Sequence, residues 1–204
     1  MKQDKEKSVL SRADFTAMAE IGTKEGVLHR DESRVINNVL GFNVILASHI
    51  MTPRTVVKAA PEKQLIREFY DNSANMRFSR IPVFEDSIDH ITGFVLKDEV
   101  LQRIIEVEGN LPLSAISRPI QAVHPGMPVP ELFTRLMDRK EHIALVVDEY
   151  GGTAGLVTME DIIETLLGLE ITDEFDAVED LQKWARERWQ ARAKSRGIQD
   201  NNTP

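Results

Sequence analysis

Short unbroken apolar runs alternate along this chain with apolar residues at helical spacing, and the clearest succession lies between residues 143 and 168. The apolar run 143–147 predicts a strand buried on both faces, and the next five residues, DEYGG, favour a tight reversal. A second strand, 153–157, leads into a helix with apolar residues on one face, which Gly168 is placed to end. The pattern therefore predicts a strand, a turn, a strand and a helix in that order.

Two polar residues stand at the junction between that second strand and the helix. Thr158 and Asp161 have the spacing of a capping box, in which each side chain binds the other residue's backbone N–H. A helix N-terminus also presents free N–H groups and a positive dipole end, which favour anions. Spacing alone leaves two interpretations open: the pair caps the helix, or Thr158 also holds a phosphate and Asp161 a sugar hydroxyl.

The same order of elements occurs earlier in the chain, which indicates an internal repeat. The first copy predicts a break at Pro53, a short strand at 56–57, a helix with Pro61 in its first turn, strands at 79–84 and 91–96, and a helix from Lys97. The second copy predicts a break at Pro119, a short strand at 121–123 and a helix opened by Pro128.

Three pairs of residues align between the copies at an offset of roughly sixty residues. They are Pro53 with Pro119, Phe69 with Phe133, and Gly93 with Gly155. We therefore predict an α/β fold of two β-α-β-β-α modules packed sheet to sheet, with N-terminal connector helices and a C-terminal helix. The predicted boundaries are a flexible lead-in at 1–10, connector helices at 11–49, modules at 50–109 and 110–169, and an acidic hinge, charged helix and polar tail at 170–204.

The connector is predicted to contain two short helices. Ser11 and Asp14 form a second capping-box pattern and open a helix that Gly22 and Gly26 interrupt. Asp31 starts the next helix, which Gly41 closes. Because such short helices are marginal alone, we expect them to dock on the modules.

Composition excludes several classes of function. A net charge of −8 and only 6% aromatic residues argue against a nucleic-acid surface. The absence of cysteine excludes disulfides, thiolate metal sites and a cysteine nucleophile. No apolar run approaches ~20 residues, so we expect the chain to be soluble. No Walker A loop, G-x-G-x-x-G or H-E-x-x-H motif occurs and the five histidines lack ligand spacing, so no catalytic residue is predicted and the chain is not expected to be an enzyme.

The segment 170–180 is strongly acidic, with six carboxylates in eleven residues. A divalent-metal site is one interpretation and a solvated charged hinge is the other. We expect the hinge, because the spacing is not that of an EF-hand.

The tandem unit, closed by Gly155-Leu156-Val157-Thr158-Met159-Glu160-Asp161, resembles the paired CBS domain, or Bateman module, whose closing Thr and Asp hold the phosphate and ribose of adenosine nucleotides. MTPR at 51–54, FSRIPV at 78–83 and DEYGG at 148–152 are similar to the cytosolic part of the CNNM/CorC family of haemolysin-like magnesium and cobalt efflux proteins. In that family the module follows a membrane domain, and we expect this chain to be a soluble fragment that begins just after it. The resemblance implies a regulatory module at the cytoplasmic face of the inner or plasma membrane, forming disc-like homodimers.

The resemblance also implies which residues would bind the nucleotide. Thr158 and Asp161 match the phosphate and ribose contacts, while Phe78 and Arg80 match an aromatic and a basic residue of the same pocket. The remaining two, Thr55 and Val57, would line the adenine side from the first short strand. The first copy has Leu96 and Glu99 at the positions of the closing Thr and Asp, so one site per chain is expected.

The expected ligand is ATP with Mg²⁺, with AMP and ADP as alternatives. Glu160, Asp161 and Glu164 in the first turns of the closing helix would repel a triphosphate, and Arg80 alone would not offset them. A Mg²⁺ held mainly by phosphates and water would supply the missing charge, with no metal ligand from the chain. Two other functions stay open: a dimerisation scaffold with an empty pocket, and a metal-dependent hydrolase that uses the carboxylates of 170–180.

Overall fold

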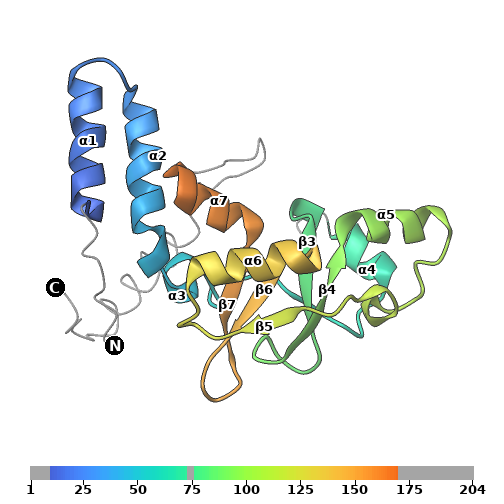
Figure 1. Ribbon diagram of the computed structural model, residues 1–204. Helices are drawn as coiled ribbons and strands as arrows, with labels where there is room; N and C mark the ends of the chain where they lie inside the picture. Colours follow the sequence, from blue (N-terminus) through green and yellow to red (C-terminus); the bar gives the residue numbers. More distant parts are fainter. Residues whose placement is uncertain (1–9, 73–75, 170–204) are drawn as a thin grey trace, which may run out of the picture.

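The computed structural model describes residues 10–72 and 76–169, and Figure 1 shows their arrangement. The connector and first module contain α1 (Arg12–Lys24), α2 (Arg30–Gly41), η1 (Phe42–Val44), α3 (Ala47–Ile50), β1 (Thr52–Pro53), β2 (Ala60–Pro61), α4 (Ile66–Asp71), β3 (Arg80–Phe84), β4 (Ile91–Leu96) and α5 (Lys97–Ile105). The second module contains η3 (Leu113–Ile116), β5 (Gln121–Val123), α6 (Val129–Arg139), β6 (Ile143–Val147), β7 (Thr153–Thr158) and α7 (Met159–Leu167).

The strands form two sheets, which pack face to face. The first sheet has the order β2-β3-β4 and the second β1-β7-β6-β5. Apolar side chains from both sheets meet in one inter-sheet cluster of Ile91, Phe94, Ile143, Leu145 and Leu156. The helices cover the outer faces (Figure 1), so each module has a helix–sheet core of its own. The predicted α/β fold of two modules packed sheet to sheet is confirmed.

The segment that leads into each module crosses over to the other one. Ala47 and Ile50 of α3 are buried in the core of the second module, and β1 pairs with β7 through Thr52 and Leu156. In the same way, Leu113 and Ile116 of η3 are buried in the core of the first module. Each module is therefore completed by the segment that precedes the other module, although the repeat runs through the sequence in simple tandem order.

Both crossings depend on a glycine that allows one backbone to approach another closely. A Cβ on Gly155 would lie 2.4 Å from the carbonyl oxygen of Thr52, and a Cβ on Gly93 would lie 2.4 Å from that of Arg118. Real Cβ atoms essentially never approach so closely, so only glycine fits at either place. The aligned pair Gly93 and Gly155 thus marks equivalent crossing points of the two copies.

The connector helices α1 and α2 form a hairpin that projects from the modules (Figure 1). Ser11 caps α1 with the predicted capping box, and its hydroxyl and amide bonds lower the pKa of Asp14 below the ordinary value. The C-terminal half of α2 packs on α7: Asn38 and Arg34 lie against Gly168, whose φ of +68° ends α7 in the left-handed conformation. The connector therefore reaches the last helix of the second module directly.

Three local predictions were wrong. The expected strand at 56–57 does not form: Val56 ends a turn and Val57 has no regular structure, because the chain leaves β1 here and crosses to the first sheet. Pro61 lies in β2, paired with Phe84, rather than in a helix, and α4 begins only at Ile66. Gly22 lies inside α1 and does not interrupt it. A proline suits a strand edge as well as a first helical turn, so its presence alone did not distinguish the two.

Candidate functional site

The second junction, where β7 passes into α7, has a complete capping box. Oδ2 of Asp161 accepts bonds from the backbone N of Thr158 at 2.6 Å and from its Oγ1 at 2.8 Å. The backbone N of Asp161 donates in return to Thr158 Oγ1 at 3.3 Å. Both side chains are half-buried. The capping interpretation is therefore confirmed, and any ligand must bind a pair already bonded to each other.

The Thr158 hydroxyl has one proton, and the bond to Asp161 uses it. To donate to a phosphate oxygen, the hydroxyl must rotate that proton away from Oδ2. Of the first backbone amides in α7, that of Met159 donates to the carbonyl of His142 and that of Asp161 to Thr158, which leaves the exposed Glu160 amide for an anion. This helix end can thus offer few donors, and binding there must draw on other elements.

Thr158 faces the layer between the two sheets. Successive residues of a strand alternate between faces, so Thr158 shares its face with Leu156, a member of the inter-sheet cluster. Its cross-strand partner Ile143 belongs to the same cluster. The second junction therefore lies at the edge of the inter-sheet layer, where a ligand can contact both modules.

Arg80 and Phe78 lie at the start of β3, on the first module. Arg80 pairs across the sheet with Leu96, which packs against the inter-sheet cluster, so the half-buried Arg80 lies on the facing side of the first sheet. Phe78 is half-buried too, with the Arg77 guanidinium 5.9 Å from its ring centre. Both residues also adjoin the first junction, because Ser79 O accepts from Lys97 N at the start of α5.

Thr55 and Val57 lie on the stretch that crosses between the sheets. Val57 packs against the inter-sheet cluster, whereas Thr55 is exposed in the turn after β1. The amide of Arg54 donates to Ala154 O, four residues before Thr158 on β7, which is about 13 Å along the strand. A ligand that contacts Thr55 and Thr158 must therefore extend along most of β7, as an elongated molecule such as a nucleotide could.

The first junction, at the β4–α5 boundary, is not a copy of the second. Leu96 makes no side-chain cap, and Glu99 instead forms an ion pair with Arg118, 3.1 Å from Nη2 to Oε2. Arg118 is held there by backbone bonds to Phe94. Sequence reasoning found the missing hydroxyl at Leu96 but missed this ion pair. The signal for it was Arg118 next to the aligned Pro119, at the position of Thr52 in the other copy.

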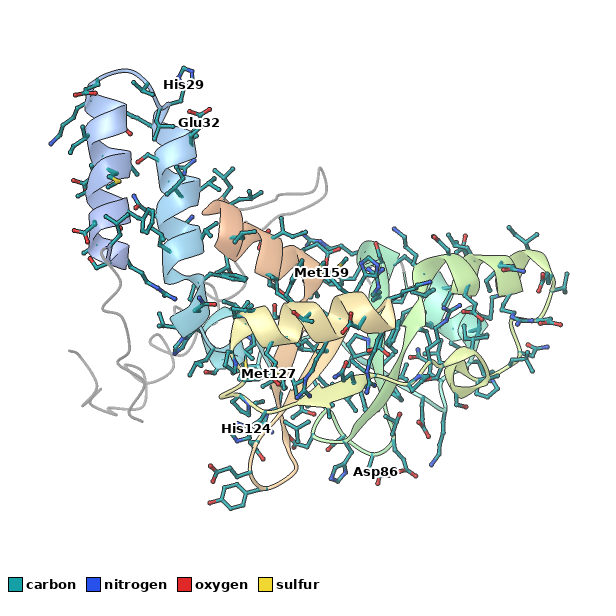
Figure 2. The ribbon with its side chains drawn as sticks, viewed as in Figure 1. His29, Glu32, Asp86, His124, Met127 and Met159 are labelled. Carbon is teal, nitrogen blue, oxygen red and sulfur yellow. The ribbon has the colours of Figure 1, made fainter. Side chains whose placement is uncertain are left out.

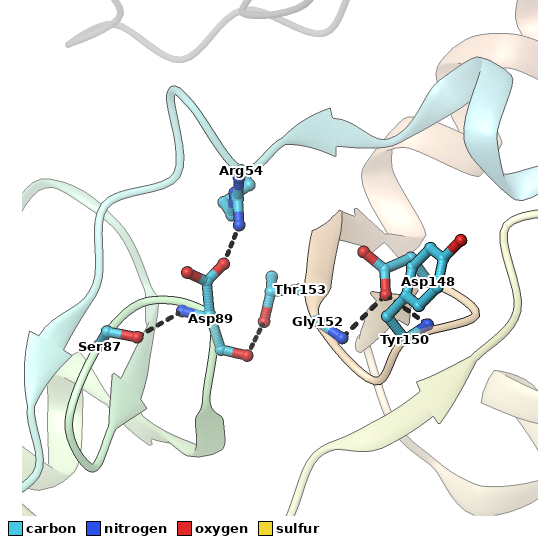
Figure 3. Close-up of polar contacts among 7 residues, drawn as sticks. All are labelled: Arg54, Ser87, Asp89, Asp148, Tyr150, Gly152 and Thr153. Atoms are coloured by element: carbon cyan, nitrogen blue, oxygen red, sulfur yellow. Dashed lines mark hydrogen bonds and ion pairs between the residues drawn. The ribbon is translucent and has the colours of Figure 1, made fainter.

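The β3–β4 loop of the first module is joined to the second sheet by polar contacts that the sequence did not indicate (Figure 3). Arg54 forms an ion pair with Asp89, and Thr153 Oγ1 donates to the carbonyl of Asp89 at 3.2 Å. In the neighbouring DEYGG loop, Oδ1 of Asp148 accepts from the amides of Tyr150 and Gly152, both at 2.9 Å. The contacts of Asp89 therefore hold the first module against the second sheet at the end of β7 opposite Thr158, and the Asp148 bonds hold the shape of the DEYGG loop.

Comparison with known proteins identifies the fold family. Residues 113–168 match the model of the CBS domain. The CBS domain structure of the bacterial CNNM/CorC family Mg²⁺ transporter is 32% identical, with a TM-score of 0.74, over 81% of this chain and 100% of that one. The chain belongs to the CNNM/CorC family. The recognition made from the MTPR, FSRIPV and DEYGG motifs is thereby confirmed.

Two further matches of the CNNM/CorC type show a ligand bound to a related domain and how much of a relative's length this chain covers. A structure of the CBS domain of the bacterial transporter in complex with ATP is 34% identical, with a TM-score of 0.64, over 68% of this chain and 98% of that one. UPF0053 protein sll1254 of Synechocystis is 36% identical over 92% of this chain and 54% of its own length. The chain thus spans about half of that curated relative. Within residues 10–72 and 76–169, no helix is long and apolar enough to cross a membrane.

Proposed function

We propose that this chain is the regulatory Mg-ATP-binding module of a membrane magnesium and cobalt efflux transporter of the CNNM/CorC family. The observation that carries the proposal is that one helix, α7, links the candidate nucleotide site to the connector helix α2. Thr158 and Asp161 lie at the start of α7, and Asn38 and Arg34 of the connector helix α2 pack against Gly168 at its end. Nucleotide binding that shifts α7 would move the connector, and through it a transport domain at the cytoplasmic face of the membrane.

Several features of the site fit an adenine nucleotide. The half-buried pair Thr158 and Asp161 and the cation Arg80 lie on facing sides of the inter-sheet layer, and Val57 adds an apolar surface in the same layer. A related CBS domain has been observed with ATP. When bound, Mg²⁺ would supply positive charge between the phosphates and the carboxylates of Glu160 and Asp161. Phe78 and Thr55 would bind from the module edges.

Isothermal titration with ATP, ADP and AMP, each with and without Mg²⁺, tests the proposal. We expect one site per chain, tighter ATP binding with Mg²⁺, and no phosphate release on incubation. Absence of heat with all three nucleotides would favour the scaffold function, in which the modules only hold copies of the chain together. Steady release of phosphate would favour a hydrolase instead.

We also expect the chain to form a homodimer through its modules. Phe69 and Leu132, on helices of the two modules, are fully buried in their own modules and are not free to form an interface. The outer helices nevertheless keep exposed apolar residues, among them Ile105 at 80% and Met137 at 57% exposure. Light scattering should therefore give the mass of a dimer at micromolar concentration. A monomer with and without nucleotide would contradict this expectation.

The acidic segment 170–180 lies outside the described residues, so its assignment as a hinge stays a prediction. If it holds no metal, replacing Asp173 and Glu174 with Asn and Gln should leave Mg-ATP affinity within a few-fold, since phosphates and water would hold the Mg²⁺. Calorimetry on this double variant checks the point. A loss on the order of a hundredfold would place a metal ligand in the segment.

A further inference from the structure

A pocket of about 450 Å³, lined by polar and charged residues, lies between the two connector helices, away from the proposed nucleotide site. Its walls come from the C-terminal half of α1 and from one face of the next helix, α2. The lining residues are Glu20, Thr23, Lys24, Arg30, Ser33, Arg34, Asn37 and Asn38. Figure 2 shows His29 and Glu32 at the outer end of this hairpin, and Met159, at the start of α7, on the body of the molecule.

Positive charge predominates in the pocket wall. Lys24, Arg30 and Arg34 line it against a single acidic lining residue, Glu20. Arg34 also forms an ion pair with Asp31, which is not a lining residue, with 2.7 Å between Nη2 and Oδ1. Neither Lys24 nor Arg30 has an ion pair within the described part of the chain. The pocket therefore favours an acidic occupant.

Two buried polar atoms in the same wall lack a partner among the described residues. They are Oδ1 of Asn37 and Nδ2 of Asn38. Ser33 beside them is only 8% exposed. Both atoms are fully covered by the protein, and Nδ2 of Asn38 lies against Gly168, so an occupant can bond to them only after the amide side chains rotate. Because unpaired buried amides are costly, such a rotation toward a peptide that carries both carboxylates and backbone amides would be favourable.

The chain leaves the described region at the edge of this pocket. Gly168, which ends α7, lies directly against two lining residues, Asn38 and Arg34. The next eleven residues beyond Leu169, EITDEFDAVED, carry six carboxylates and no basic residue. The most acidic stretch of the chain thus begins within two residues of the positive pocket.

The distances allow the acidic stretch to cover the pocket. Arg30 and Asn38 are eight residues apart on α2, which is about 12 Å of helix. Asp173 and Glu174 follow Gly168 by five and six residues, a reach of up to about 17–21 Å for an extended chain. Because the segment is tethered beside the pocket, its effective concentration there is in the millimolar range, so weak charge pairs suffice to hold it.

We propose that the acidic segment 170–180 docks in the pocket between α1 and α2, with its carboxylates against Lys24, Arg30 and Arg34. The docked segment joins the end of the second module to the outer part of the connector, beyond the contact at Gly168. It therefore stiffens the junction between module and connector, in a way that depends on ionic strength because the charges are near the surface.

Hydrogen exchange read by mass spectrometry on the full chain tests this docking. At low salt the amides of 170–180 should exchange on the order of tenfold more slowly than in a Lys24→Glu/Arg30→Glu variant, and the difference should disappear near 1 M salt. Both substituted side chains are exposed, so the fold should remain. Asp173→Lys/Glu174→Lys should lose the protection likewise, and the combination of all four changes should restore it.

Arg139→Glu, which reverses an exposed charge on α6, is the matched control and should leave exchange in 170–180 unchanged. Equal exchange in the parent chain and the Lys24→Glu/Arg30→Glu variant would overturn the docking, and would fit pairing of the acidic segment with the basic stretch 183–196 instead. Slower exchange in α2 on adding inorganic phosphate, with 170–180 unprotected throughout, would show a small-anion site and overturn it too.

Discussion

Asp161→Asn is expected to weaken ATP binding by roughly 2–4 kcal/mol, on the order of thirtyfold to a thousandfold, because two charge-assisted hydrogen bonds to the ribose would be lost. The same change should lower the free energy of unfolding by at most ~1 kcal/mol. The amide oxygen of Asn can still accept from Thr158 N, the shorter of the two bonds that Oδ2 now receives. This variant should therefore lose much of its ATP affinity while keeping most of its stability.

Two other variants complete the comparison. Thr158→Ala should weaken ATP more than adenosine, since the hydroxyl is proposed to bind a phosphate. Glu99→Gln changes the equivalent position of the first junction, where the carboxylate pairs with Arg118 rather than with a cap, and should leave ATP affinity nearly unchanged. Calorimetry and thermal melts on all three give the answer. If Asp161→Asn binds ATP as tightly as the parent chain, the second junction is a capping box alone.

Gly155→Ala should destabilise the fold by about 1–3 kcal/mol or more, the range found when atoms are forced into a packed site. The new methyl would lie 2.4 Å from the carbonyl oxygen of Thr52, so β1 must move away from β7. For a chain of this size, each kcal/mol corresponds to about 2–4 °C in Tm. Gly93→Ala should destabilise the fold by a similar amount, because its new methyl would lie at the same distance from the carbonyl oxygen of Arg118.

Gly41→Ala is the matched control, because nothing lies within 4 Å of the place its Cβ would take. At the end of α2, alanine should be neutral or stabilise the helix by up to about 1 kcal/mol. Urea unfolding of the three variants measures these differences. A Gly155→Ala chain as stable as Gly41→Ala would mean that β1 is not held against β7 as described.

The sequence predicted the elements whose signals are local. Thr158 and Asp161 were recognised as a capping box, Gly168 as a helix end, and the strands and helices between residues 79 and 168 lie close to their predicted positions. The recurring order of elements and three aligned pairs of residues, Gly93 with Gly155 among them, indicated the repeat. Each of these signals depends on neighbours a few residues away, or on a comparison of the chain with itself.

What the sequence missed depends on contacts between distant residues. Residues 56–57 were predicted as a strand, because no neighbouring residue indicates that the chain turns at 54–56 and that Val57 packs in the inter-sheet layer. The burial of Leu113 in the first module and of Ala47 in the second reverses the tandem order, and no local pattern encodes that exchange. The pairing of Glu99 with Arg118 arises from the same crossing.

The exchange of leading segments also sets an order for folding during synthesis. β1 is made early, but its partner β7 follows 104 residues later, from Thr52 to Leu156. At ~5–20 residues per second, a ribosome needs about 5–20 s to supply that partner. Throughout this interval Ala47 and Ile50 have no core to enter, while η3 can already complete the first module. The first module should therefore become protease-resistant on the ribosome well before the segment that precedes it.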